Sequence, residues 1–236
     1  MIDCVVWWAR PVADPGEYLA LLTPVERERY EAYRQDADRR RFLTGRTLAR
    51  TVAAERLGVD PGDVEFDATC TDCDKQHGPP RIPGVDLALS ISHAGERVGV
   101  ALTAGAPVGL DVEAASRRAD DGLLRYALND TELAALDRLS APERTDGFFR
   151  YWTRKEAVMK ATGRGLRIPL QSITLSPPGE PARLIASDHP ELTPEGTRMA
   201  DLDPGAGYRA AVAVLTMEEI EVTERWWGPM PDSHGQ

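Results

Sequence analysis

Two carboxylates lie two residues apart in the segment PVGLDVE, at residues 107–113. Side chains alternate between the faces of a strand, so Asp111 and Glu113 would share one face, opposite three apolar residues. Their backbones would lie roughly 6–7 Å apart, which lets both carboxylates reach one cation. Oxygen ligands suit Mg²⁺, which also binds phosphate oxygens. Gly109, on the same face, is expected to leave open space where a ligand approaches. An edge strand with two solvated acids is the alternative interpretation.

A second set of reactive side chains lies in YWTRKEAVMKATGRGL, at residues 151–166. Residues four apart are neighbours on a helix, so Trp152, Glu156 and Lys160 would share one face. Glu156 is a candidate for a third metal ligand or a general base. Lys155 and Lys160 are candidates for neutralising phosphate charge. An exposed Glu–Lys pair, which is common on helix surfaces, is the alternative.

Two further segments carry polar groups suited to anions. In SISHAG, at residues 90–95, a strand ends in a histidine and a glycine turn, where Ser92 and His93 could hydrogen-bond a phosphate. A lone histidine after a strand is more often structural. Residues 24–57 hold nine arginines against six acids, the most basic segment of the chain. A solvated helix face with salt bridges is the alternative there.

Periodicity and turn residues predict the elements that position these groups. We expect strands at the N-terminus and at 87–92, 97–104, 108–113, 182–186 and 208–216, and helices at about 24–57, 121–137 and 144–162. Residues 58–84, rich in Gly and Pro, are expected to form a loop. The strand at 97–104 resembles residues 209–216, which favours two similar α+β halves joined near 105–107.

Composition limits the class of protein. The 236 residues are 42% hydrophobic and carry a net charge of −10, which indicates a globular chain and disfavours nucleic acid or membrane as a partner. Three cysteines, Cys4, Cys70 and Cys73, favour a reducing compartment over a disulfide framework. The apolar N-terminus lacks the features of a signal peptide, so a cytoplasmic location is expected.

In this order and spacing, the segments resemble the Sfp-type 4′-phosphopantetheinyl transferases over nearly the whole chain, about 1–220. That family shows a Ser-His-Ser/Ala-Gly turn, a Gly-Ile/Leu-Asp-Val/Ile-Glu strand, and a Trp-Ser/Thr-x-Lys-Glu-x-x-x-Lys helix that ends in Gly-x-Gly-Leu. Its basic helix follows Thr/Ser-Pro, as residues 24–57 follow Thr23 here.

The resemblance implies an α+β fold of two similar α/β halves in a pseudo-twofold arrangement, as a monomer. The halves would span 1–105 and 106–227, with a disordered tail at 228–236. It also implies a Mg²⁺-dependent transfer of 4′-phosphopantetheine from coenzyme A to a serine of an apo acyl or peptidyl carrier protein, releasing adenosine 3′,5′-bisphosphate. The acceptor would serve polyketide, nonribosomal peptide or fatty-acid synthesis.

The resemblance also implies roles for single residues. Asp111, Glu113 and Glu156 would bind Mg²⁺, with Mn²⁺ as an alternative, and Glu156 would take the proton of the acceptor serine. Asp111 and Lys160 complete the implied catalytic set, and Lys160 also contacts phosphate. The implied coenzyme A contacts are Arg29 and Arg41 near the 3′-phosphate, with Ser92, His93 and Lys155.

One departure concerns the loop before the Ser-His turn. The family has Gly-Lys-Pro there, whereas this chain has Pro79 in place of the lysine, with Arg81 as a candidate for the missing charge. Nearby, Cys70, Cys73 and His77 have partial zinc spacing, although two free loop cysteines are favoured.

Two other functions compete with the transferase. A binding module without catalysis would lack an acidic ligand or the helix lysine, and all are present. An unrelated Mg²⁺-dependent phosphohydrolase would not explain the turn at Ser92 and His93.

Overall fold

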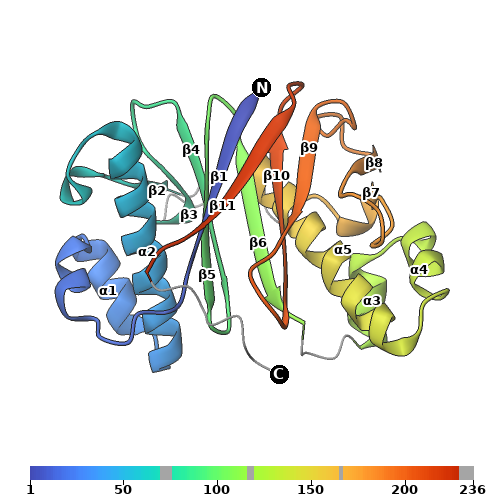
Figure 1. Ribbon diagram of the computed structural model, residues 1–236, viewed down its shortest axis with the longest axis horizontal. Coiled ribbons are helices and arrows are strands. Elements are labelled where there is room, and N and C mark those ends of the chain that lie inside the picture. Colours follow the sequence, from blue (N-terminus) through green and yellow to red (C-terminus); the bar gives the residue numbers. More distant parts are fainter. Residues whose placement is uncertain (70–75, 116–119, 165–166, 229–236) are drawn as a thin grey trace.

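The polypeptide forms four layers, in the order helix, sheet, sheet, helix (Figure 1). The computed structural model describes residues 1–69, 76–115, 120–164 and 167–228. The N-terminal half contains β1 (Ile2–Ala9), α1 (Pro24–Ala32), α2 (Asp36–Leu57), β2 (Asp67–Thr69), β3 (Gln76–Arg81), β4 (Leu87–Ala94) and β5 (Arg97–Ala104). The C-terminal half contains β6 (Val108–Ala114), α3 (Asp121–Ala127), α4 (Asp130–Leu136), α5 (Ala141–Thr162), β7 (Ile173–Leu175), β8 (Leu184–Ser187), β9 (Thr197–Leu202), β10 (Tyr208–Leu215) and β11 (Ile220–Trp226).

The two main sheets repeat one strand order. The first sheet has the order β11-β1-β5-β4, and the second has the order β6-β10-β9. Strands β5 and β10, which resemble each other in sequence, are the central strands of the two repeats β1-β5-β4 and β6-β10-β9. The mixed α+β class is therefore as predicted, while the pseudo-twofold relation and the monomeric state stay predictions.

Strand β11 departs from this repeat. It follows β10 in the chain but pairs in parallel with β1, with Ile2 opposite Ile220 and Trp8 opposite Trp226. The segment 106–227 thus supplies one strand to the sheet of the other half. The division into halves at residues 105 and 106 stays a prediction.

The predicted strands and the helix at 144–162 are confirmed with small shifts at their ends, and the helices predicted at 24–57 and 121–137 each form two helices, α1 with α2 and α3 with α4. Five strands of the described chain were not predicted. Strands β2 and β3 pair within the segment 58–84 that was expected to be a loop. Strands β7, β9 and β11 are the others that the described chain adds. The predicted tail beyond residue 228 lies outside the described residues. No helix in the described part of the chain has the length and apolar character needed to cross a membrane.

A capping box starts the basic region. Thr23 accepts a hydrogen bond from the Glu26 backbone N–H at 3.3 Å, and Glu26 accepts one from the Thr23 N–H at 3.0 Å. The Glu26 carboxylate also pairs with Arg50 at 2.8 Å and with Arg46 at 3.4 Å. Since both arginines belong to α2, one carboxylate fixes the start of α1 and its packing on α2.

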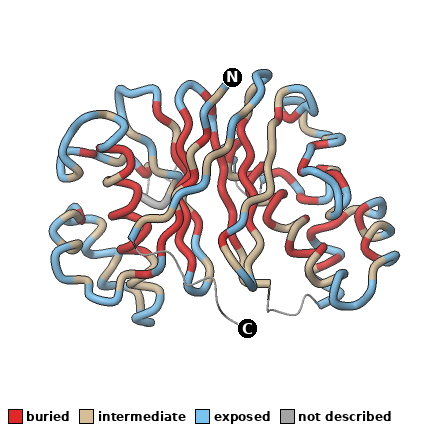
Figure 2. Tube along the Cα trace, in the orientation of Figure 1, coloured by how far each residue is buried: buried red, intermediate tan, exposed pale blue. Residues whose placement is uncertain are grey.

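Buried residues follow the sheets and the inner faces of α2 and α5 (Figure 2). Between the sheets lies a core that includes Val6, Trp8, Leu110 and Val212. The alternation predicted for residues 108–113 is confirmed, because the three apolar residues of β6 all belong to this core. The opposite face of β6 is therefore turned toward α5.

Gly109 does not leave open space for a ligand, which corrects the expectation from sequence. A Cβ atom on Gly109 would lie 2.0 Å from the Ala157 carbonyl oxygen and 2.4 Å from the Ala161 nitrogen. The backbone of α5 therefore occupies the space that the missing side chain provides. The glycine brings Glu156 and Lys160, which flank Ala157 and Ala161 on the helix, close to the strand that carries Asp111.

We expect Gly109→Ala to lower the free energy of unfolding by about 3 kcal/mol or more, because the methyl group meets backbone that cannot rotate away. Chemical denaturation measures this directly. Gly179→Ala is the matched control, since a Cβ there meets nothing within 4 Å. Equal stability of the two variants would show that α5 does not pack against Gly109 in this way.

Candidate active site

Serine side chains join the two sheets where β4 runs beside β6. The Ser90 hydroxyl oxygen accepts a hydrogen bond from the Leu110 backbone N–H at 3.0 Å, and Ser92 accepts one from the Val112 N–H at 3.3 Å. These two bonds take the place of a backbone ladder between β4 and β6, and we call this contact the β4–β6 junction. Ser90 was missed from sequence, although it lies two residues before Ser92 on the same strand face.

Lys160 closes the junction from α5. Its ammonium lies 2.7 Å from Asp111 Oδ1 and donates to the Ser92 hydroxyl at 3.1 Å and to the Leu110 carbonyl at 3.0 Å. The Ser92 hydroxyl donates in turn to Asp111 Oδ1 at 3.0 Å. The Lys160 side chain is 32% exposed and the Asp111 side chain 7%, so the lysine links a buried carboxylate to the surface.

Ser92 therefore does not meet the expectation that it contacts coenzyme A. Its hydroxyl proton goes to Asp111, and its oxygen accepts from Lys160 and Val112. The residue is buried and orients the aspartate.

Asp111 and Glu156 are electrostatically coupled across the gap between β6 and α5. Burial raises the pKa of Glu156 above its usual value, and the negative charge of Asp111 raises it further, against the opposing charge of Lys160. The second oxygen of Asp111, Oδ2, is buried and has no hydrogen-bond partner among the described residues. Both observations indicate that the space between Asp111 and Glu156 would accommodate a further positive charge.

A divalent cation fits this place. Two carboxylates, with phosphate oxygens and water in the remaining positions, form the hard oxygen set that Mg²⁺ prefers. Glu113 follows Asp111 by two residues on β6 and lies on the same face. Within the described residues, however, no three His, Cys, Asp or Glu side chains gather closely enough to hold a metal. The structure thus couples Asp111 with Glu156 but does not assemble the predicted three-carboxylate centre.

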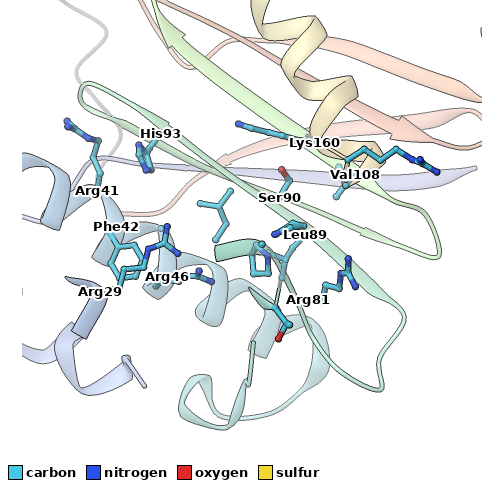
Figure 3. A pocket seen from close by; sticks show the side chains of 18 of the residues that line it. Arg29, Arg41, Phe42, Arg46, Arg81, Leu89, Ser90, His93, Val108 and Lys160 are labelled. Carbon is cyan, nitrogen blue, oxygen red and sulfur yellow. The ribbon is translucent and has the colours of Figure 1, made fainter. Parts of the chain in front are cut away.

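A cationic pocket of about 460 Å³ opens beside Lys160 (Figure 3). Its described lining contains seven cationic side chains and no carboxylate, in a chain with a net charge of −10. The seven are Arg29, Arg41, Arg46, Arg81, Lys160, Arg164 and Arg167. Apolar groups, among them Phe42, Leu89 and Ile91, line the same pocket. Such a lining suits a ligand with several negative charges and an apolar or aromatic part.

The predicted contacts Arg29, Arg41, Arg81 and His93 all line this pocket. Arg81 lies on β3 close to Pro79, so the arginine supplies charge to the wall where the family lysine was expected. Arg46, Arg164 and Arg167 were missed. Arg46 belongs to the segment whose excess of arginine was noted, but the sequence alone does not say which of nine arginines face a cavity.

His93 is neutral over a wider pH range than an ordinary histidine. Partial desolvation, followed by the positive charges of Arg41 and Lys160, lowers the pKa of His93, although the residue keeps an exposed edge. Arg41 is held close by, with one guanidinium nitrogen 2.5 Å from Asp38 and another donating to the Gly95 carbonyl at 3.2 Å. A neutral histidine among cations can still donate a hydrogen bond to an anion.

The structure contradicts the prediction that Lys155 contacts phosphate. Its side chain is 0% exposed, its ammonium lies 2.6 Å from Glu132, and it donates to the carbonyls of Leu170 and Ile173 at 2.7 and 2.8 Å. These three bonds use its three protons. Lys155 lies about 100° round the helix from Glu156, which turns it into the core of the C-terminal half. The suggested zinc ligands Cys70 and Cys73, and the side chain of His77, lie outside the described residues.

Lys155→Met is expected to lower the free energy of unfolding by about 3–5 kcal/mol, because it leaves the Glu132 carboxylate buried without its cation. The double variant Lys155→Met/Glu132→Leu, which removes both charges, should recover part of this loss. Chemical denaturation measures the stability, and calorimetry measures the affinity of the pocket for inorganic pyrophosphate. Weaker pyrophosphate binding at unchanged stability would restore Lys155 as a phosphate contact.

Comparison with known proteins identifies the family of this chain. The family model described as the 4′-phosphopantetheinyl transferase superfamily matches residues 107–213, which contain Asp111, Glu156 and Lys160. A 4′-phosphopantetheinyl transferase of Bacillus subtilis is 30% identical over 173 residues, covering 72% of this chain and 74% of that protein. The 4′-phosphopantetheinyl transferase HetI of a Nostoc species is 31% identical over 222 residues, covering 90% and 88%. The 4′-phosphopantetheinyl transferase Sfp of Bacillus subtilis is 27% identical over 212 residues, covering 88% and 89%. This chain therefore belongs to the 4′-phosphopantetheinyl transferase superfamily, the enzyme class that its three motifs predict.

Proposed function

We propose that this enzyme transfers the 4′-phosphopantetheine arm of coenzyme A to a serine of an apo acyl or peptidyl carrier protein, with Mg²⁺ or Mn²⁺ as its metal. One observation carries the proposal: a pocket lined by seven cations, with no carboxylate among its described residues, opens beside Lys160, which holds Asp111. Coenzyme A combines a 3′-phosphate, a pyrophosphate and an adenine ring, which suits this mixture of cationic and apolar groups. The curated relatives carry the same transferase name.

The pocket binds and orients the nucleotide. Arg29, Arg41 and Arg46 come from the two N-terminal helices and lie on one side of the pocket, while Lys160 comes from α5 (Figure 3). We assign the 3′-phosphate to the arginine side and the pyrophosphate to the Lys160 side. This orientation brings the phosphorus that is attacked close to Asp111 and Glu156, and it restricts the motion of the reacting groups.

Asp111 and Glu156 are the residues that would hold the metal, with Glu113 on the same strand face as a further candidate. When bound, the metal neutralises negative charge on the phosphate oxygens. Lys160 orients Asp111 through their 2.7 Å ion pair, and its positive charge beside the pocket would offset the negative charge that develops on the departing bisphosphate.

The reaction requires a proton acceptor but no nucleophile from this chain. The serine oxygen of the carrier forms a bond to phosphorus, the bond from phosphorus to the bisphosphate oxygen breaks, and the serine proton goes to Glu156. The raised pKa of Glu156 suits this role, because it makes the carboxylate a better base than an ordinary glutamate. Carriers of polyketide, nonribosomal peptide or fatty-acid synthesis are the proposed acceptors, in the cytoplasm, with the enzyme as a monomer.

We expect purified enzyme, coenzyme A and Mg²⁺ to add one phosphopantetheine group to an apo carrier protein, as measured by intact mass. A chelator should abolish the gain, and Glu156→Gln should lower kcat by at least about 10²-fold. Glu195→Gln is the matched control, because this glutamate is exposed and far along the chain from the site.

Two results would overturn the proposal. Unmodified carriers across a panel of acyl and peptidyl types, with coenzyme A bound, would indicate a binding module. Release of adenosine bisphosphate without any carrier would indicate a phosphohydrolase.

We also expect the activity to fall, at the acidic end of its pH profile, at a pH above the usual pKa of a glutamate. Glu156 acts as a base only when ionised, its pKa is raised, and activity should therefore fall as pH drops through that raised value. Increasing Mg²⁺ should move this acidic limb to lower pH, because a cation favours the ionised form. The pH profile of kcat at several Mg²⁺ concentrations measures both effects. An acidic limb whose position does not change with Mg²⁺ concentration would show that Glu156 does not bind the metal.

A further inference from the structure

The turn between β4 and β5 forms part of the cationic pocket. His93, which lies at the end of β4 just before the turn, lines the pocket, and the Gly95 carbonyl in the turn accepts a hydrogen bond from Arg41 at 3.2 Å. Arg41 itself lines the pocket. The position of the turn therefore affects the positions of His93 and Arg41, two groups of the N-terminal half that would face the nucleotide.

A tyrosine of the C-terminal half holds this turn from its other side. The hydroxyl oxygen of Tyr208, the first residue of β10, accepts a hydrogen bond from the Glu96 backbone N–H at 2.9 Å. A Cβ atom on Gly95 would lie 2.6 Å from the same oxygen, and Gly95 has a positive φ of +52°. Only glycine permits both this backbone conformation and this approach.

Tyr208 is in turn fixed by a stack of aromatic and cationic groups. The Arg97 guanidinium carbon lies 4.6 Å from the centroid of the Tyr208 ring and 5.4 Å from that of Trp226 in β11. Arg97 is 8% exposed, and its Nε donates to the Pro204 carbonyl at 2.5 Å. A buried guanidinium that lies over the faces of two aromatic rings and is itself held by a hydrogen bond leaves the tyrosine ring little freedom.

We infer that Tyr208 is a positioning residue for nucleotide binding: its hydroxyl group sets the turn at 93–96, and through it Arg41 and His93. The inference rests on the proposed function of the pocket and extends it to a residue of the opposite half. Tyr208 acts on the pocket wall and not on the reacting atoms. Asp111, Glu156 and Lys160 lie on β6 and α5, and we expect them to be unaffected by its loss.

Tyr208→Phe keeps the ring and its stacking on Arg97 but removes the acceptor for the Glu96 N–H. We expect Kd for adenosine 3′,5′-bisphosphate, measured by calorimetry, to rise about three- to tenfold, the range of one lost hydrogen bond. KM for coenzyme A should rise in parallel while kcat stays within about twofold. Tyr126→Phe is the matched control, since Tyr126 is 54% exposed on α3.

A double-mutant cycle with Arg41→Ala tests the route of the effect. If Tyr208 acts through the turn and Arg41, Tyr208→Phe should weaken binding clearly less in the Arg41→Ala protein than in the wild type. A Tyr208→Phe protein with lower thermal stability and unchanged Kd overturns the inference and leaves the proposed function intact. A wild-type protein that does not bind adenosine 3′,5′-bisphosphate overturns both.

Discussion

The ion pair between Lys160 and Asp111 lies where the two halves of the molecule meet, and most of the site depends on it. Asp111 is buried between a strand and a helix, in a place where an unpaired carboxylate costs several kcal/mol. Lys160 offsets that cost with a 2.7 Å contact, and Ser92 adds a hydrogen bond to the same oxygen. These partners satisfy only one oxygen of the aspartate. The other oxygen, Oδ2, is buried and has no hydrogen-bond partner among the described residues, which is why we propose that it holds the metal. One carboxylate would then serve both the junction between the halves and the proposed chemistry.

The repeated strand order would by itself produce two such junctions, and in the described part of the chain β11 occupies the place of the second. β4 lies beside the free edge of β6, and the corresponding edge of β1 is covered by β11, which also contacts β9. Aligning β5 with β10 places Trp8 of β1, opposite Gly99, at the position that Asp111 holds opposite Ala211. The Trp8 indole N–H donates to Glu224 of β11 at 2.7 Å. The second junction is therefore filled with an aromatic core residue and an added strand.

The sequence predicted the helices and strands whose apolar and polar side chains recur with a clear period. It also predicted relations between residues that lie close together in one such element. The alternation in β6 and the four-residue spacing of Glu156 and Lys160 are properties of single elements, so a pattern reveals them. The environment of Lys155 is not local, because Glu132, Leu170 and Ile173 come from other parts of the chain. The same limit applies to Gly109. The sequence does not distinguish a glycine that leaves space for a ligand from one that leaves space for the backbone of a helix. β11 is a different case, since Ile220 and Val222 alternate with Glu221 and Thr223, a period that the sequence does contain.

The distribution of charge is compatible with both binding of the nucleotide and docking of the carrier protein. The chain carries ten more negative than positive charges, yet the described lining of the pocket contains seven cationic residues and no carboxylate. A cationic cavity within an acidic surface attracts a small polyanion over a short range, because salt screens longer distances beyond about 10 Å. An acidic carrier protein would be repelled by much of the surface and tolerated only near the basic helices and the pocket. In the proposed reaction, that restriction would bring the carrier serine toward Glu156, so the arginines that we propose as nucleotide contacts would also favour the productive approach of the second substrate.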